Sequence, residues 1–289
     1  MNYRYYLDRS SKKFPCPNCQ KKTFVRYMDA IENNYLEANF GRCDRESKCG
    51  YHNKPDGNQR IISPHAGTFI RPEASFHNED SLHIGGNDFN GNHFIRYLQK
   101  FYDRETIIAA IEKFRIGNSN HWAGATVFWQ INEKLQICAG KVMLYDPITG
   151  KRVKDPYPHI NWMHKVLKLD RFVLQQCLFG IHNLGLHPEG STVCIVESEK
   201  TAIIMSIRYP QFLWLATGSK SNFKHELLKP LKGYHVIAFP DKTEFENWSK
   251  KVEVMTKRGL SIRVNPFLEH RGLEEGADLV DFFAQKEAA

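Results

Sequence analysis

The chain has 289 residues, of which 42% are hydrophobic, 12% aromatic and 25% charged. These values are typical of globular proteins and exclude a disordered or fibrous chain, and the length is sufficient for two domains. No window reaches the roughly 18 uncharged apolar residues of a membrane span, and the first residues lack the apolar core of a secretory leader. We therefore expect a cytoplasmic protein. The net charge of +8 makes nucleic acid a candidate partner, although mild basicity alone is common.

Four of the seven cysteines crowd near the N-terminus, which predicts metal binding and not a disulfide framework. Cys16 and Cys19 are separated by two turn-forming residues, a spacing that lets both thiolates face one tetrahedral ion. Cys43 follows as a third ligand, and either Cys49, which we favour, or His52 supplies the fourth. A closed site with four ligands predicts structural zinc, which holds a small fold together.

Alternating segments at residues 23–27 and 35–40 lie between the two halves of the zinc motif and predict a hairpin. We therefore expect residues 1–60 to form a zinc ribbon. Basic side chains surround the motif and alternate with aromatic ones, including Phe24 and Tyr27, a mixture that can hold phosphates and stack unpaired bases. The same mixture is also typical of the solvated face and small core of any ribbon.

Residues 61–91 are rich in Asn, Asp, Gly, Pro, Ser and His, which predicts a linker. Residues 92–188 then follow an α+β pattern. Two helices are expected first, the second capped by Asp103, and a hairpin of residues 126–131 and 135–145 follows them.

Basic residues accompany and follow this hairpin, among them Lys141, Arg152 and Lys165. They predict a surface that contacts phosphates, with a plain solvated rim as the alternative.

Residues 189–289 alternate strands with helices, which predicts a mostly parallel sheet covered on both faces. Ligands bind such sheets beyond the carboxyl ends of the strands, and Glu197 and Asp241 each follow an apolar strand. Two such carboxylates form a candidate site for a divalent metal, to which Asp278 and Asp281 could add. The alternative is that Glu197 and Asp241 merely begin the next helices, where the helix dipole favours a negative charge.

These residues resemble a known family. Glu197, Gly218, Asp241 and the late pair Asp278 and Asp281 are similar in placement to the toprim domain of bacterial primases, topoisomerases and related nucleases. The zinc ribbon narrows the resemblance to primases. It implies an α/β fold in which the ribbon precedes a primase-like core that ends in a Rossmann-like toprim domain.

Other segments extend the resemblance over the whole chain. Residues 140–143 and 176–181 are similar to stretches of primase cores that precede the toprim domain. Residues 196–202, with residues 239–241 and Trp248, resemble more closely the toprim-like proteins of Bacteroidetes chromosomes and mobile elements.

The resemblance implies that Glu197, Asp241 and Asp278 hold Mg²⁺ or Mn²⁺. It implies that Lys200, with Lys141 or Lys165, neutralises triphosphate or template phosphates. The sequence departs from the family after the third strand. Primases place Asp, any residue, Asp at this point, whereas this chain has Thr243, and Glu244 comes one position too late.

The resulting hypothesis is an enzyme, a primase-like nucleotidyltransferase that makes short RNA primers on single-stranded DNA from ribonucleoside triphosphates. A replicative helicase is a candidate partner. The alternative is a catalytically weakened toprim-like module of a mobile element that binds single-stranded nucleic acid, which Thr243 favours. A toprim nuclease fits less well, because the zinc ribbon and the primase-like middle segment would have no evident part in it.

Overall fold

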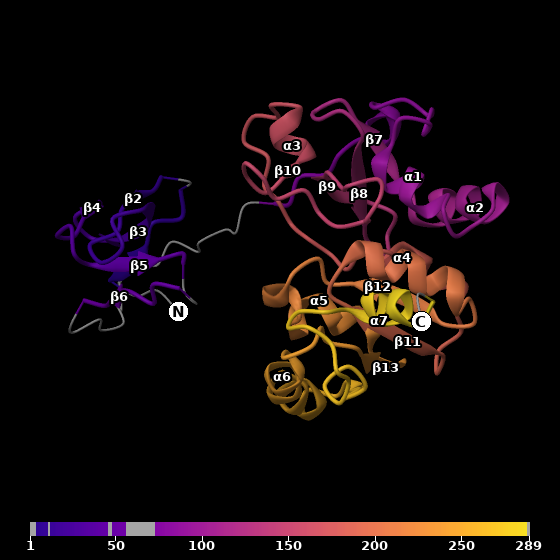
Figure 1. Ribbon diagram of the computed structural model, residues 1–289. Helices are drawn as coiled ribbons and strands as arrows, with labels where there is room; N and C mark the ends of the chain where they lie inside the picture. Colours follow the sequence, from indigo (N-terminus) through magenta and orange to yellow (C-terminus); the bar gives the residue numbers. More distant parts are fainter. Residues whose placement is uncertain (1–3, 11, 46–47, 56–72, 288–289) are drawn as a thin grey trace. The chain divides into compact units, whose positions relative to one another are not determined.

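The computed structural model describes residues 4–10, 12–45, 48–55 and 73–287. The chain forms two compact units, Met1–Arg71 and Pro72–Ala289 (Figure 1). Among the described residues, no helix combines the length and the apolar character needed to cross a membrane.

The first unit is a small antiparallel sheet built around one long strand. Its strands are β1 (Tyr5–Leu7), β2 (Phe14–Pro15), β3 (Lys22–Asp29), β4 (Asn34–Tyr35), β5 (Gly41–Cys43) and β6 (His52–Asn53). Strand β3 pairs with β1, β2, β4 and β5, and β6 extends the sheet beyond β5. The fully buried side chains of its core are those of Phe24, Cys16 and Cys43. Such a small apolar core needs an additional cross-link, which a metal ion supplies.

The second unit begins with an antiparallel sheet in the order β10-β9-β8-β7. Its strands are β7 (Gly117–Ser119), β8 (Ala125–Ile131), β9 (Ile137–Met143) and β10 (Ile160–Trp162). The expected hairpin is confirmed as β8 and β9, and residues alternate between its two faces. Val127, Trp129 and Ile131 pack with Met163 on one face, whereas Phe128 joins the core on the other.

Three helices accompany this sheet: α1 (His93–Leu98), α2 (Arg104–Phe114) and α3 (Met163–Val166). The predicted cap of the second helix is confirmed, because Asp103 accepts a hydrogen bond from the Thr106 backbone N–H at 2.8 Å. Asn92 caps α1 in the same way.

The predicted linker of residues 61–91 lies partly outside the described residues, and its remainder is folded. The Ser75 N–H donates to the Val173 carbonyl at 3.0 Å, and the His77 N–H donates to the Ile137 carbonyl at 2.9 Å. The 3₁₀ helix η1 (Glu79–His83) follows. The segment from Ser75 onward therefore belongs to the second unit, because its backbone groups are paired with that unit.

The remainder of the second unit contains a four-stranded parallel sheet in the order β12-β11-β13-β14, so the α/β fold class is confirmed. The strands are β11 (Thr192–Val196), β12 (Leu213–Ala216), β13 (His235–Ala238) and β14 (Ser261–Val264). The helical segments are η2 (Ile181–Leu186), α4 (Glu199–Arg208), η3 (Lys220–Asn222), α5 (His225–Leu228), η4 (Lys229–Leu231), α6 (Phe245–Lys257) and α7 (Leu279–Glu287).

Helices cover both faces of this sheet (Figure 1). In β11, Val193 and Ile195 pack with Trp248 of α6, whereas Cys194 and Val196 pack with α4 and α7. This alternation explains why the strand is apolar from Val193 to Val196. Phe128 of the antiparallel sheet reaches the same core as α4 and α7, so the two sheets of this unit share packing.

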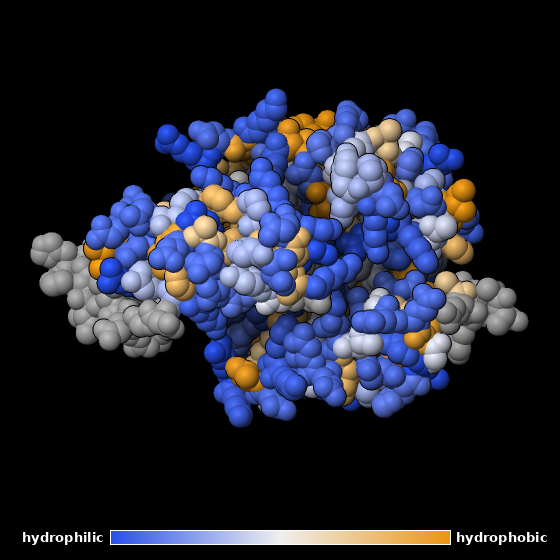
Figure 2. Space-filling view, turned by 60° about the vertical axis from the view of Figure 1, so that its left-hand side comes forward, coloured by the Kyte–Doolittle hydropathy of each residue, from blue (hydrophilic) through white to orange (hydrophobic). Residues whose placement is uncertain are grey.

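The face in Figure 2 is covered mainly by hydrophilic residues, and hydrophobic residues form small separate groups on it.

Candidate metal centres and active-site cavity

The four N-terminal cysteines come together as one cluster. Their sulfur atoms all lie within 4.8 Å of one another, with 3.7 Å between the sulfurs of Cys16 and Cys49 and 4.0 Å between those of Cys19 and Cys43. A tetrahedral ion with Zn–S bonds of about 2.3 Å separates its ligand sulfurs by about 3.8 Å. The Asn18 side-chain amide also donates to the Cys49 sulfur at 3.4 Å. The cluster therefore fits a structural zinc ion.

His52, the alternative fourth ligand, lies elsewhere. Its Nε2 atom is 3.1 Å from the Tyr27 hydroxyl, and the two rings stack at an interplanar angle of 12°. In the structure it is Cys49 that joins the other three cysteines.

Phe24 and Tyr27 are not available for stacking on bases, contrary to the sequence-based expectation. Phe24 is fully buried in the ribbon core and Tyr27 is 9% exposed. A stacking ring must offer a free face, so both residues serve as core. Phe14 and Tyr35 are half-buried, their rings lie 5.2 Å apart, and the Arg26 guanidinium lies over both of them.

Most of the predicted residues of the second unit line one cavity of about 670 Å³. These are Lys141, Arg152, Glu197, Lys200, Asp241 and Asp278. Lys165 lies in α3 and is absent from the cavity lining.

Glu197 and Asp241 reach the cavity from the carboxyl ends of two adjacent parallel strands. Strand β11 pairs with β13 in parallel, so the chain leaves both strands at the same edge of the sheet. The Glu197 Oε2 atom is buried and has no hydrogen-bond partner among the described residues. An unpaired buried carboxylate oxygen is costly, which makes this edge suited to a cation.

The electrostatics of the two carboxylates agree with this geometry. Burial raises the pKa of Glu197. Burial, followed by the charges of Glu197 and Asp278, raises the pKa of Asp241 to about 8. A cluster of negative groups in a partly desolvated cavity is stabilised by protonation or by a bound divalent ion. This pair of carboxylates is therefore a candidate site for Mg²⁺ or Mn²⁺.

Asp278 contributes charge but has few free oxygen lone pairs. Its Oδ1 atom accepts backbone N–H bonds from Val280 at 2.8 Å and Asp281 at 3.0 Å, and its Oδ2 atom accepts from the Thr201 hydroxyl. Asp281 accepts the Asp278 N–H at 3.0 Å in return. Asp278 thus caps the N-terminus of α7, where a negative charge is favourable.

Lys141, expected to contact phosphates, is instead buried in an ion pair. Its ammonium lies 3.1 Å from both Glu199 oxygens and donates to the Gly218 carbonyl at 2.8 Å. The side chains are 9% and 2% exposed. Gly218 has a φ of +74°, and a Cβ there would lie 2.8 Å from Glu199. The ion pair therefore ties β9 to the start of α4. The absence of a side chain at Gly218 leaves room for the Glu199 carboxylate.

The sequence reasoning missed Glu199. The spacing of the Glu-Ser-Glu string gave one signal, because the second carboxylate lies in the first turn of the helix that follows Glu197. Its partner lies 58 residues away, so the sequence alone could not pair them.

The cationic wall of the cavity comes from the turn after β9. Asp146 organises this turn by accepting the backbone N–H groups of Ile148 at 3.0 Å and Thr149 at 2.7 Å. The turn places the basic side chains of Lys151, Arg152 and Lys154 on the cavity, and α4 adds Lys200. The same cavity is also lined by Glu197 and Asp241, and a cavity with both charges is suited to a ligand that carries phosphates and a bound metal ion.

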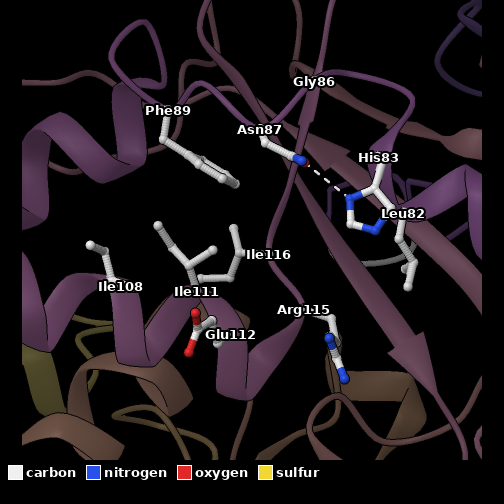
Figure 3. A pocket seen from close by; sticks show the side chains of 10 residues that line it. All are labelled: Leu82, His83, Gly86, Asn87, Phe89, Ile108, Ile111, Glu112, Arg115 and Ile116. Carbon is white, nitrogen blue, oxygen red and sulfur yellow. Dashed lines mark hydrogen bonds between the residues drawn. The ribbon is translucent and has the colours of Figure 1, made fainter.

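A second cavity, of about 340 Å³, has a different character. Phe89, Ile108, Ile111 and Ile116 line it, with Glu112 and other residues at its margin (Figure 3). None of the predicted catalytic or nucleic-acid-binding residues lies there.

A family model described as "Domain of unknown function (DUF6371)" matches residues 92–242. A second one, described as a zinc beta-ribbon finger, matches residues 3–61. No curated protein matches the chain.

Three similar solved structures are domains of DNA primases. The primase fragment of the bacteriophage T7 primase-helicase is 15% identical, over 95% of this chain and 94% of that one, with a TM-score of 0.44. The DnaG catalytic core is 13% identical, over 66% and 67%, with a TM-score of 0.45. The zinc-binding and RNA polymerase domains of the Aquifex aeolicus primase are 10% identical, over 97% and 77%, with a TM-score of 0.39.

Proposed function

The chain belongs to the DUF6371 family, and we propose that it is a cytoplasmic primase-like nucleotidyltransferase that synthesises short RNA primers on single-stranded DNA. The observation that carries this proposal is the unpartnered, buried oxygen of Glu197, which lines one cavity together with Asp241 and the basic residues Lys151, Arg152, Lys154 and Lys200. The toprim-like placement of these residues in the sequence supports the same assignment.

In this proposal the acidic residues of the cavity bind the metal ion and the basic residues bind the triphosphate. A bound Mg²⁺ or Mn²⁺ would supply positive charge to the triphosphate and to the attacking 3′ hydroxyl. Glu197 and Asp241 hold that ion at the strand ends. Arg152 and Lys200, with the neighbouring lysines, bind and orient the triphosphate of the incoming ribonucleotide.

Other residues keep this arrangement in place. The Lys141–Glu199 pair fixes β9, whose following turn carries the basic wall, against α4, whose N-terminus follows Glu197. Little covalent chemistry is required of the chain, because phosphoryl transfer depends mainly on positioning and electrostatic stabilisation.

The zinc ribbon is proposed to hold the single-stranded template. Lys12 and Arg26, which lie over the rings of Phe14 and Tyr35, offer cations for the template backbone. A replicative helicase is a candidate partner within this proposal.

A second candidate function is a binding module for single-stranded nucleic acid without polymerase activity. The observation that favours it is at the third strand, where Thr243 is exposed and the Glu244 carboxylate is already paired with Lys220. In this alternative the carboxylate edge binds metal too weakly to support synthesis.

The test is incorporation of labelled ribonucleotides on single-stranded DNA with Mg²⁺ or Mn²⁺. We expect products from the wild type, and none from Glu197→Gln or Asp241→Asn. The matched control is Glu253→Gln, because Glu253 is exposed on α6 and does not line the cavity. Absence of products from the wild type, together with salt-sensitive binding of single strands, would support the binding module instead.

A further inference from the structure

Four aromatic side chains of the second unit form a continuous row of ring contacts. The rings of Tyr157 and His159 stack, with their centroids 4.6 Å apart and an interplanar angle of 19°. The His159 ring makes a T-shaped contact with Trp122 at 5.0 Å, and Trp122 contacts His121 at 4.3 Å. None of these four residues, called here the aromatic row, lines either of the two cavities described above.

Tyr157 offers the free ring face that base stacking requires. It is 52% exposed, and one face of its ring lies against His159. Among the described residues, neither a second ring nor a cation lies over it. The rings of Phe14 and Tyr35 in the ribbon differ, because the Arg26 guanidinium already lies over both. A base can therefore stack on Tyr157 without displacing another group.

The loop that carries Tyr157 holds this ring in place. The His159 N–H donates to the Val153 carbonyl at 3.2 Å, which closes the loop. The Leu144 N–H donates to the His159 carbonyl at 3.2 Å, which ties the loop to the end of β9. Prolines stand on both sides of Tyr157 and fix the backbone φ angle at their own positions. A ring that is ordered before binding loses little conformational entropy when a base stacks on it.

The other end of the row is attached to the antiparallel sheet. Trp122 is partly buried against the core that contains Trp129. The side-chain amide of Asn161, in the edge strand β10, donates to His121 Nε2 at 2.9 Å. His121 itself is exposed. The row therefore has exposed rings at both ends and half-buried rings between them.

The charge around the row fits a polyanion. Residues 150–171, which contain half of the row, carry six Lys and Arg against two Asp. Lys151, Arg152 and Lys154 of this segment line the large cavity, and Lys165 follows on α3. Cations bind phosphates and exposed rings stack on unpaired bases, so this composition fits a nucleic acid. A single strand fits better than a duplex, because its base faces are available for stacking.

We propose that the aromatic row binds single-stranded nucleic acid, with one base stacked on the free face of Tyr157 and the strand passing along the basic side chains to the cavity. His159 and Trp122 support the Tyr157 ring from behind. The inference rests on the proposed function where it identifies this strand as the template. The stacking itself requires neither a metal ion nor a ribonucleotide, so a binding measurement tests it separately.

The test measures binding of a fluorescent oligothymidylate to the full-length, zinc-loaded protein by anisotropy, without Mg²⁺ or ribonucleotides. Tyr157→Leu should weaken binding by about tenfold, because it removes one base stack. Tyr157→Phe keeps the ring and should bind as the wild type does. Phe101→Leu is the matched control, because it removes a ring that is 51% exposed and lies outside the row, and it should leave the affinity unchanged. The salt dependence of binding should be the same in Tyr157→Leu as in the wild type, because stacking involves no charged group.

Photocrosslinking of the wild type to an oligonucleotide that carries 5-iododeoxyuridine gives a second measurement that does not depend on a variant. Mass spectrometry should locate an adduct on Tyr157. Unchanged affinity in Tyr157→Leu, an equal loss in Phe101→Leu, or adducts confined to residues 1–71 would overturn the inference and leave the synthesis test of Glu197→Gln unaffected. Loss of affinity in Tyr157→Leu in a protein that makes no primers would instead support the row and remove the proposed synthesis.

Discussion

The buried pair of Lys141 and Glu199 allows a quantitative test of how the active-site cavity is held together. Lys141→Met removes the ammonium and keeps a side chain of similar length. Glu199, with 2% of its side chain exposed, would then retain a buried charge without its partner. Breaking a buried ion pair in this way costs about 3–5 kcal/mol, and the Gly218 carbonyl also loses the 2.8 Å hydrogen bond that it accepts. For a unit of this size we expect the melting temperature to fall by about 10 °C.

A double-mutant cycle separates loss of the pair from loss of packing. Lys141→Met combined with Glu199→Gln removes both charges, so most of the lost stability should return. All five tryptophans lie in the second unit, so intrinsic fluorescence during urea unfolding reports on that unit alone.

The control is Lys154→Met, which removes an exposed lysine of the same cavity and should change stability by less than about 0.5 kcal/mol. A cost below about 1 kcal/mol for Lys141→Met, or a double variant no more stable than the single one, would show that the buried ion pair does not hold the cavity together.

Three further predictions concern zinc, divalent metal and backbone. Chelation of zinc, or Cys16→Ser, should unfold the ribbon while the tryptophan-monitored transition stays unchanged. Burial raises the pKa of the Cys16 thiol to about 11, so bound zinc should be released as the pH falls. A colorimetric zinc assay would follow this release. Burial raises the folded-state pKa of Asp241 to about 8, above its unfolded value. The metal-free protein should therefore lose stability as the pH rises through 8. The increase in melting temperature that Mg²⁺ produces should grow between pH 6 and pH 9. A melting-temperature increase independent of pH would contradict this assignment. Gly218→Ala should cost about 1–3 kcal/mol in urea unfolding, because φ is +74° and the new Cβ would press on Glu199.

The sequence predicted the features that depend on local pattern. Apolar runs ending in Glu197 and Asp241 predicted parallel strands with carboxylates at a common edge, and the register of β11 with β13 brings both residues to one cavity. The cysteine spacing predicted the cluster of four thiols in the same way. These features were accessible because strand periodicity and ligand spacing are properties of short segments.

The features that escaped prediction depend on contacts between distant segments. Lys141 appeared as one basic residue among many, and only the folded structure reveals its buried partner Glu199. Phe24 appeared to be a stacking residue, but strand β3 is central in its small sheet and places that ring in the core. The ion pair of Lys220 with Glu244 joins residues 24 positions apart that no local pattern relates.

The most direct test of the proposed function measures two properties of the Glu197→Gln variant side by side. Primer synthesis is measured with labelled ribonucleotides, and affinity for single-stranded DNA is measured by fluorescence anisotropy at fixed salt concentration. We expect synthesis to be abolished while the dissociation constant changes by less than about twofold, because Glu197 holds the metal and not the template. Equal loss of both activities in a folded variant, or undiminished synthesis, would contradict this expectation.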